Sequence, residues 1–200
     1  MKTTSKNYIW RHALVELTAK TSALILIDLQ KGIVNLPLAP RSGADVVSAA
    51  AGLAQRFRDA GAPVIIVNVG FSPDFGDALQ QPVDQSFSPP GGYAPDFSEI
   101  VDGLVGKGDI LVTKRQWSAF YGTELDLQLR RRGIKSIVIG GIATNFGVES
   151  TARQGYELGY EIVVPEDATA TLSPDLQNVS IGAILPQIGR ITTASDIVLK

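Results

Sequence analysis

Short, almost continuously apolar runs alternate with helical patterns along the chain. Runs such as LILI and IVIG are what strands buried on both faces of a parallel sheet require. Six strands are predicted on this basis: Ala23–Ile27, Val64–Asn68, Ile110–Val112, Ser136–Ile139, Glu161–Val164 and the short Arg190–Thr192.

Helical spacing fills most of the connections between these strands. An amphipathic helix is predicted over Asp45–Ala60, where apolar residues such as Val46, Leu53 and Phe57 share one stripe. N-capping patterns mark the starts of helices at Ser42 with Asp45, Thr123 with Asp126, and Ser173 before Pro174. The repeated β-α-β order predicts a doubly wound, Rossmann-like α/β/α domain in three layers, with a mostly parallel six-stranded sheet. Its 200 residues fit one domain, with residues 1–20 as an N-terminal extension.

The stretch Pro73–Gly92 breaks this rhythm with four prolines and three glycines. A loop of this length is either a functional lid or poorly ordered. Aromatic residues in and beside it favour a packed loop, and both a lid and a subunit contact are compatible with it. These aromatic residues are Phe71, Phe75, Phe87 and Tyr93.

Composition narrows the class of protein. Hydrophobic residues make up 44% of the chain and charged residues 19%, and the net charge is −2, which gives no electrostatic reason for binding nucleic acid or an anionic membrane. No apolar run is long enough to span a bilayer, and the first twenty residues lack the apolar core of a signal peptide. The chain has no cysteine, which excludes disulfides and thiolate metal sites. A cytoplasmic location is the simplest expectation.

Two charged residues follow predicted strands at the edge where ligands of open parallel sheets collect. Asp28 follows the first strand and Lys114 the third. Asp28 can be a catalytic carboxylate or an acid that caps a turn, and Lys114 can be its partner or a surface lysine beside Arg115. If they meet, the ammonium group favours the ionised form of Asp28 unless burial opposes it.

The segment Gly140–Arg153, GGIATNFGVESTAR, combines a strand end, a Gly-rich turn and the start of a helix near Phe146. Such a turn aims backbone N–H groups and a helix dipole at one small volume, which suits a developing negative charge. Glu149 and Arg153 are spaced for an i,i+4 ion pair on that helix, and Glu166 and Asp167 are interpreted as turn residues.

These motifs together resemble the isochorismatase-like (cysteine) hydrolase superfamily. Members carry an Asp after the first strand, a Lys after the third and a nucleophilic Cys after the fourth, which correspond to Asp28, Lys114 and Gly147. The sequence segments IDLQKG, SAFYGTELD and VPEDATAT also match the family, so that the resemblance extends from about Ala23 to Ile197. It implies the isochorismatase-like fold, activation of the nucleophile by the Asp and Lys, and an oxyanion hole from N–H groups of the turn, including Ala143, and of position 147. It also implies that the Ile142–Ala143 bond is cis.

Glycine at position 147 changes the expected chemistry. It removes nucleophilic catalysis by a thiol but keeps the backbone N–H, and it is expected to vacate volume for a larger substrate. Authentic isochorismatases resemble this chain in having Gly there, and they hydrolyse a vinyl ether with a general acid and water. Their turn has the sequence Y-A-H where this chain has A-T-N, so the residues with which they recognise their substrate are absent here.

The remaining candidates have weaker signals. Trp117 and Phe120 are candidates for the wall of a substrate pocket, or for core or dimer contacts. Asn145 either orients the turn, where it would reach substrate, or caps the next helix, and capping is favoured. His12, the only histidine, precedes the first strand and is expected to be structural or exposed. No His follows Val64–Asn68, as it does in the metal-binding branch of the superfamily, so neither a metal nor another cofactor is predicted.

The sequence thus predicts a hydrolase that converts a small anionic metabolite without a thiol, with Asp28 as acid/base and Lys114 as electrostatic partner. The alternative is a small-molecule-binding relative that has lost catalysis, and amide hydrolysis by water is the third hypothesis. A homodimer or larger homo-oligomer is expected, with the loop Gly70–Tyr93 or the segment Trp117–Tyr121 in the interface.

Overall fold

A central parallel sheet organises the computed structural model, which describes residues 14–86 and 92–200. Each of the six predicted strands is present: β2 (Ser22–Ile27), β3 (Val64–Val69), β4 (Ile110–Lys114), β5 (Ser136–Ile142), β6 (Glu161–Pro165) and β8 (Arg190–Thr192). They pair in the order β4-β3-β2-β5-β6-β8, and every pair is parallel. A seventh strand, β7 (Thr169–Ala170), pairs with β5 and was not predicted because two residues are too short for a pattern.

A second, two-stranded sheet was also missed. It joins β1 (Val15–Leu17) to β9 (Ile197–Leu199) in parallel. Val15 and Leu17 are buried in the core. Residues 14–20 therefore belong to the packed domain, which corrects the prediction of an extension over 1–20 for the part that the structure describes; His12 lies outside the described residues.

The direction of winding reverses between β2 and β5. From β2 the chain continues to β3 and β4 on one side, whereas β5, β6 and β8 extend the sheet on the other. In such sheets the crevice for ligands forms beyond the carboxyl ends of the two strands at the reversal. Asp28 directly follows β2, and the turn that carries Gly147 directly follows β5.

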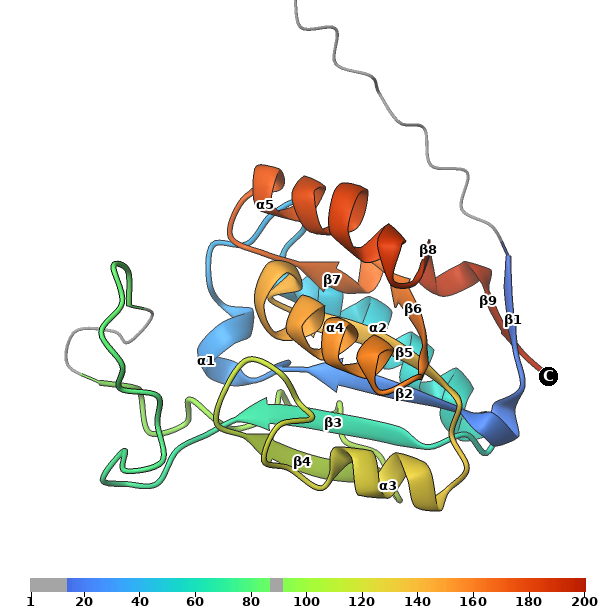
Figure 1. The fold of residues 1–200 in the computed structure, drawn as a ribbon, viewed down its shortest axis with the longest axis horizontal. Helices are drawn as coiled ribbons and strands as arrows, with labels where there is room; N and C mark the ends of the chain where they lie inside the picture. The colour runs from blue at the N-terminus through green and yellow to red at the C-terminus, as the bar shows by residue number, and fades with distance from the viewer. Residues whose placement is uncertain (1–13, 87–91) are drawn as a thin grey trace, which may run out of the picture.

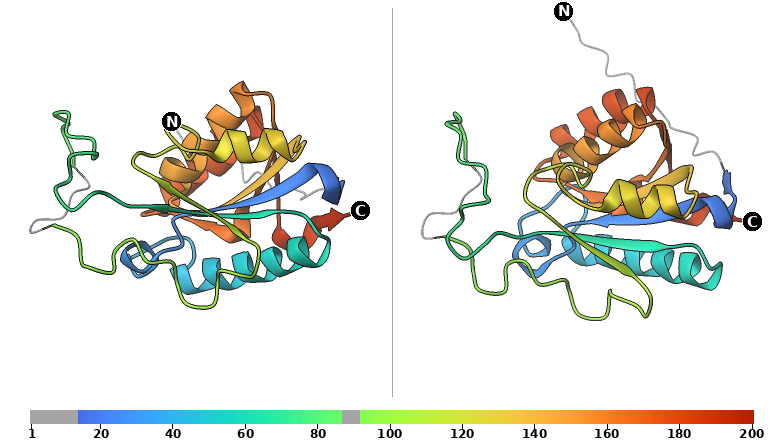
Figure 2. Two further views of the ribbon diagram at one scale, coloured as in Figure 1. Left: turned by 90° about the horizontal axis from the view of Figure 1, so that it is seen from below. Right: turned by 60° about the horizontal axis from the view of Figure 1, so that its bottom comes forward.

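Helices cover both faces of the sheet, as predicted (Figures 1 and 2). The short α1 (Lys31–Val34) and the long α2 (Gly43–Asp59) lie on one face, and α3 (Leu125–Arg131), α4 (Glu149–Glu157) and α5 (Pro174–Val179) lie on the other. The alternation of side chains along β2 supplies both layers of the core: Leu24 and Leu26 pack toward α2, whereas Ile25 and Ile27 pack toward α3 and α4.

Two of the three predicted caps form as expected. Ser42 and Asp45 make a reciprocal capping box on α2, and the Ser173 hydroxyl accepts from the Leu176 amide at 3.3 Å. The third differs: Thr123 accepts from the Leu125 amide at 3.1 Å, but the Asp126 carboxylate does not cap back. It accepts instead from the Tyr160 hydroxyl at 2.7 Å, so a tertiary contact replaces the local one.

The connection between β3 and β4 projects beyond the carboxyl ends of the strands (Figure 1). In the part of it that the structure describes, residues 70–86 and 92–109, no helix or strand forms. Its aromatic rings pack together: the Tyr93 centroid lies 5.6 Å from Phe71, 5.9 Å from Phe75 and 4.2 Å from Phe97. The predicted packing is therefore present for these rings, and Phe87 lies outside the described residues. We call residues 70–86 with 92–97 the arm.

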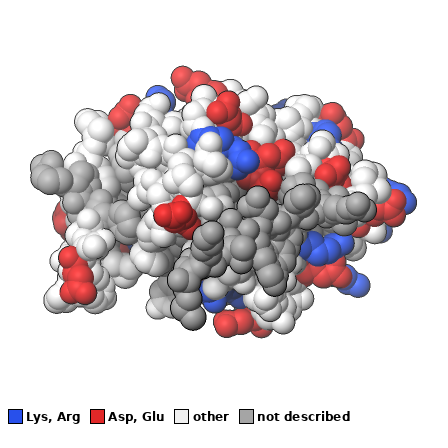
Figure 3. All heavy atoms as spheres, turned by 90° about the horizontal axis from the view of Figure 1, so that it is seen from above, with Lys and Arg blue, Asp and Glu red and all other residues white. Residues whose placement is uncertain are grey.

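The surface is mixed in charge. On the face seen from above, acidic and basic residues are scattered between wide neutral areas, with no extended patch of one sign among the coloured residues (Figure 3). No helix within residues 14–86 and 92–200 is long and apolar enough to cross a membrane.

Candidate active site

Asp28 and Lys114 form a buried ion pair at the carboxyl edge of the sheet. Lys114 is the last residue of β4 and reaches across β3, so that its Nζ lies 2.7 Å from Asp28 Oδ2. Asp28 has a positive φ of 53°, and its amide donates to the Val67 carbonyl at 2.8 Å. The two residues are only 5% and 2% exposed, so little solvent screens their interaction.

The second carboxylate oxygen of Asp28 has no partner. Oδ1 is buried and makes no hydrogen bond with any residue that the structure describes. Burial raises the pKa of the Asp28 carboxyl, and the charge and hydrogen bond of Lys114 oppose this shift without cancelling it. A buried oxygen without a partner is unfavourable for folding. The site therefore holds a carboxyl group with one oxygen fixed by Lys114 and the other open to a proton or a ligand.

Gly147 lies directly against this carboxyl group. After β5 the chain passes through the cis Ile142–Ala143 bond that the resemblance implied, then through a π-helical turn (Thr144–Val148) into α4. A Cβ atom at position 147 would stand 3.2 Å from Asp28 Oδ2. Position 147, which corresponds to the nucleophile, thus faces the Asp28–Lys114 pair.

The volume expected from the glycine is not vacant. The same Cβ would stand 2.8 Å from Cγ2 of Ile27, a contact too close for real atoms. Ile27 is the fully buried last residue of β2. The expectation of added space at this point was therefore wrong, because glycine here allows the turn to pack directly onto β2.

An aromatic pair stands next to the turn. The Trp117 and Phe146 rings meet edge to face with their centroids 5.0 Å apart, and Trp117 is 51% exposed. The Trp117 carbonyl oxygen would lie 3.6 Å from a Cβ at position 147. Trp117 thus lies beside the turn that carries Gly147, and its role in binding substrate stays a prediction. Phe146 was not among the predicted site residues, although its place beside Gly147 in the turn was the available signal.

Phe120 does not border the site. It is 5% exposed, and its ring stacks on that of Tyr160 at 5.8 Å. It also lies close to Gly155, two turns of helix beyond Gly147. Of the two alternatives for Phe120, the structure supports the core contact and not the wall of a substrate pocket, because the ring is enclosed beside α4.

The turn itself is held from inside the protein. The Ala143 carbonyl accepts from the amides of Phe146 and Val148 at 3.1 and 3.3 Å. The Asn145 side chain accepts a hydrogen bond from the Thr171 hydroxyl and makes no helix cap. The favoured capping role was therefore wrong, and Asn145 orients the turn against the segment after β7.

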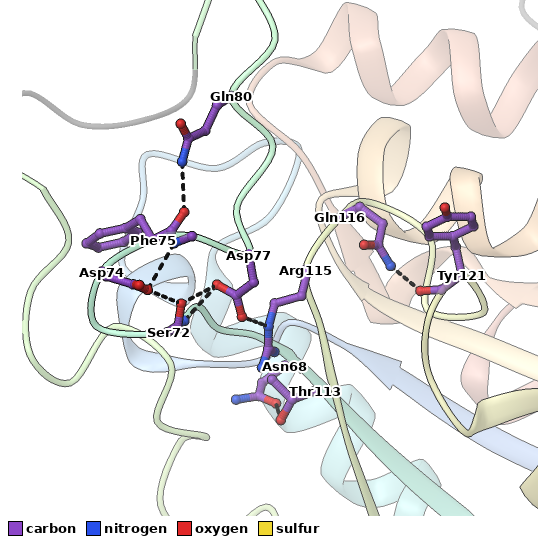
Figure 4. Close-up of polar contacts among 11 residues, drawn as sticks. Asn68, Ser72, Asp74, Phe75, Asp77, Gln80, Thr113, Arg115, Gln116 and Tyr121 are labelled. Carbon is purple, nitrogen blue, oxygen red and sulfur yellow. Dashed lines mark hydrogen bonds and ion pairs between the residues drawn. The ribbon is translucent and has the colours of Figure 1, made fainter.

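Polar side chains anchor both ends of the arm beside the ion pair. Asp77 accepts from the Ser72 amide and hydroxyl at 2.8 and 2.9 Å and pairs with Arg115, the neighbour of Lys114 (Figure 4). These contacts, the Ser72 amide above all, lower the pKa of Asp77 to about 2. Gln30, two residues after Asp28, donates to the Phe97 carbonyl at 2.8 Å and accepts from the Val69 amide at 2.8 Å. The sequence did not indicate these anchors.

The other predicted contacts are local. Glu149 and Arg153 form the expected ion pair at 2.9 Å. The Asp167 carboxylate accepts from the Ala194 amide at 2.7 Å, as a turn residue would. Within the described ranges, no three acidic, His or Cys side chains are placed to hold a metal ion, and the absence of a metal stays a prediction.

Comparison with known proteins agrees with this arrangement. Residues 22–196 match the isochorismatase domain. The chain is 47% identical over 186 residues to the isochorismatase family protein YecD of Escherichia coli O157:H7, which covers 92% of this chain and 98% of YecD. It is 46% identical over 177 residues to YwoC of Bacillus subtilis (strain 168), covering 88% and 91% of the two chains.

A solved structure shows the same fold. An isochorismatase family protein from Burkholderia thailandensis superposes with a TM-score of 0.88 at 48% identity, covering 92% of this chain and 97% of that one. The chain belongs to the isochorismatase family.

Proposed function

We propose that the protein hydrolyses a small anionic metabolite without a thiol, with Asp28 as general acid and base and Lys114 as its electrostatic partner. The observation that supports this most directly is the carboxyl group of Asp28. Lys114 holds its Oδ2 at 2.7 Å, its Oδ1 is buried without a partner, and burial raises its pKa. A carboxyl group that keeps its proton to higher pH is suited to donate it.

Hydrolysis of a vinyl ether fits these groups. Asp28 gives its proton to the terminal methylene carbon, which leaves an oxocarbenium ion and a carboxylate paired with Lys114. Water adds to the cationic carbon and returns a proton to Asp28, and the hemiketal then separates into a ketone and an alcohol. No step forms a bond to the protein, in keeping with the absence of cysteine. The N–H groups of Ala143 and Gly147 are assigned to binding the negative charge of the substrate. Trp117 and Asn145 are assigned to the border of the substrate site.

A second candidate function is binding without turnover. The Asp28–Lys114 pair is almost completely buried, and Ile27 fills the space beside Gly147. Both observations favour a family member whose site has lost the space for catalysis and only binds a small molecule.

A substrate screen with a matched pair of variants tests the two candidates. The purified protein, Asp28→Asn and the exposed-residue control Asp102→Asn are assayed against vinyl ethers, amides and esters of small acids. Turnover by the wild type and the control, lost in Asp28→Asn, supports the enzyme. Saturable binding without turnover in all three supports the binder. Amide turnover that survives in Asp28→Asn contradicts both.

We also propose that the protein acts in the cytoplasm as a homodimer or larger assembly. The arm exposes Leu79 and Val83 by 63% and 65%, and Tyr121, four residues after Trp117, is 69% exposed. Apolar side chains gathered on a projecting segment are usually covered by a partner. The lack of cysteine suits a reducing compartment.

A further inference from the structure

A basin of about 460 Å³ lies at the amino-terminal edge of the sheet. Its rim comes from residues that precede strands: Lys20 before β2, Pro63 before β3, Asp109 before β4 and Ile134 before β5. Because the strands are parallel, this edge is opposite to Asp28 and Lys114, which follow β2 and end β4. A strand of six residues separates the edges by roughly 20 Å. The basin is therefore distinct from the candidate active site.

The lining is strongly cationic in a protein whose net charge is −2. Lys20, Arg58, Lys107 and Arg132 contribute positive charges, and Asp109 is the only carboxylate among the lining residues. An excess of three positive charges therefore gathers in one small concave volume. Such a concentration of one sign in a hollow raises the local concentration of anions.

The single carboxylate is already used by the protein. Asp109 accepts from the Arg58 Nε and Nη2 at 3.0 and 2.7 Å and from the Gly106 amide at 2.8 Å, and its side chain is only 2% exposed. Arg58 is fixed further by the Leu104 carbonyl at 2.8 Å. This pair therefore uses the only carboxylate among the lining residues. The exposed Asp59 also acts on Arg58, but it does not line the basin.

The other three cations have no acidic partner. Lys20, Lys107 and Arg132 form no ion pair with any residue of the described ranges. Arg132 donates from one nitrogen to its helix neighbour Gln128. Three exposed cations that face one hollow repel one another, and an anion of higher charge relieves that repulsion.

We propose that this basin binds a small, multiply charged oxyanion of the phosphate or polycarboxylate type. The volume lies in the range of small-molecule sites. Lysine ammonium groups and the guanidinium of Arg132 are the donors that phosphate and carboxylate oxygens favour. The site is independent of the proposed hydrolysis and binds its ligand whether or not Asp28 is catalytic.

Calorimetric titration with inorganic pyrophosphate tests the proposal, and citrate as a second probe distinguishes phosphate from carboxylate ligands. The variants are Arg132→Gln and Lys107→Gln. Their matched controls are Arg131→Gln and Lys135→Gln, which remove the same charges at exposed residues that do not line the basin. We expect saturable binding of at least one probe, weakened about tenfold or more by each lining variant and less than twofold by each control.

Two further readouts separate this site from the active site and from general charge attraction. Trp117→Ala, which changes a half-exposed side chain beside the candidate active site, should bind the probe as the wild type does. A saturating probe should raise the melting temperature of the wild type but not that of the Lys107→Gln/Arg132→Gln double variant. No saturable binding of either probe, equal weakening by lining and control variants, or loss of binding in Trp117→Ala each overturns the proposal.

Discussion

Ile27 occupies the position that a side chain at residue 147 would need. Its Cγ2 lies 2.8 Å from the Cβ position of Gly147, which in turn stands 3.2 Å from Asp28 Oδ2. The glycine therefore has a packing role as well, because without a side chain at position 147 the turn after β5 can lie directly on the end of β2. Restoring a side chain at this position requires the Ile27 side chain, β2 or the turn to move.

This contact predicts a coupled stability effect. Gly147→Ala should lower the free energy of unfolding by about 1–3 kcal/mol, because an extra methyl group overpacks a filled site. The same substitution in an Ile27→Ala background should be milder by about 1 kcal/mol or more, since the obstructing Cγ2 is gone. Urea unfolding of the four proteins measures the coupling, and strictly additive effects would contradict it.

A second prediction concerns a thiol introduced at position 147. Gly147→Cys alone should react slowly with iodoacetamide, since Ile27 crowds the Cβ atom of a side chain at this position. Combined with Ile27→Ala it should react faster than a cysteine at exposed Asp102, because the Lys114 ammonium favours the thiolate. Equal rates at the two positions would show that Lys114 does not activate this location.

Removing one partner of the buried ion pair should be more harmful than removing both. Lys114→Met leaves the Asp28 carboxyl buried without a cation and should lower stability at neutral pH by about 3–5 kcal/mol. The double variant Asp28→Asn/Lys114→Met leaves no charge and should recover a large part of that loss. The exposed control Lys135→Met should change stability by less than about 0.5 kcal/mol. Equal losses in the single and double variants would argue against an isolated buried charge.

The raised pKa of Asp28 fixes the sign of a pH effect. The folded protein holds this proton to higher pH than the unfolded chain, whose aspartate pKa is about 3.9. The wild type should therefore lose stability relative to Asp28→Asn as pH rises from about 4 through the folded-state pKa. Unfolding free energies of both proteins across this window measure it. If Asp28 acts as a general acid, turnover should fall over the same pH window. Unfolding free energies that change in parallel with pH in the two proteins would contradict the raised pKa of Asp28.

The arm predicts the assembly state. Light scattering at micromolar concentration should show a homodimer or larger species. Leu79→Gln/Val83→Gln should shift it toward the monomer, while Leu127→Gln, an exposed apolar residue on α3, should not. A monomeric wild type would mean that the arm packs only against its own domain.

The local pattern was sufficient for most of the scaffold. Continuous apolar runs specified the inner strands β2, β3, β5 and β6, because both faces of such a strand are covered and nearly every position is apolar. The edge strands β4 and β8 were also predicted. The helix starts at Ser42 and Ser173 were readable because capping depends on neighbours in the chain. Strands β1, β7 and β9 were not predicted, because runs of two or three residues are stabilised by their partners and carry little periodicity.

The candidate site was likewise predictable only in part. The sequence by itself placed Asp28, Lys114 and Gly147 after three strands, and parallel strands necessarily bring those positions to one edge. Only the tertiary structure decided that Lys114 reaches across β3 to Asp28, that Phe120 turns into the core, and that Ile27 fills the space beside Gly147. Topology follows from local pattern, whereas distances between side chains depend on the packing of residues far apart in the chain. The cationic basin likewise exists only because four loops distant in sequence meet at the amino edge of the sheet.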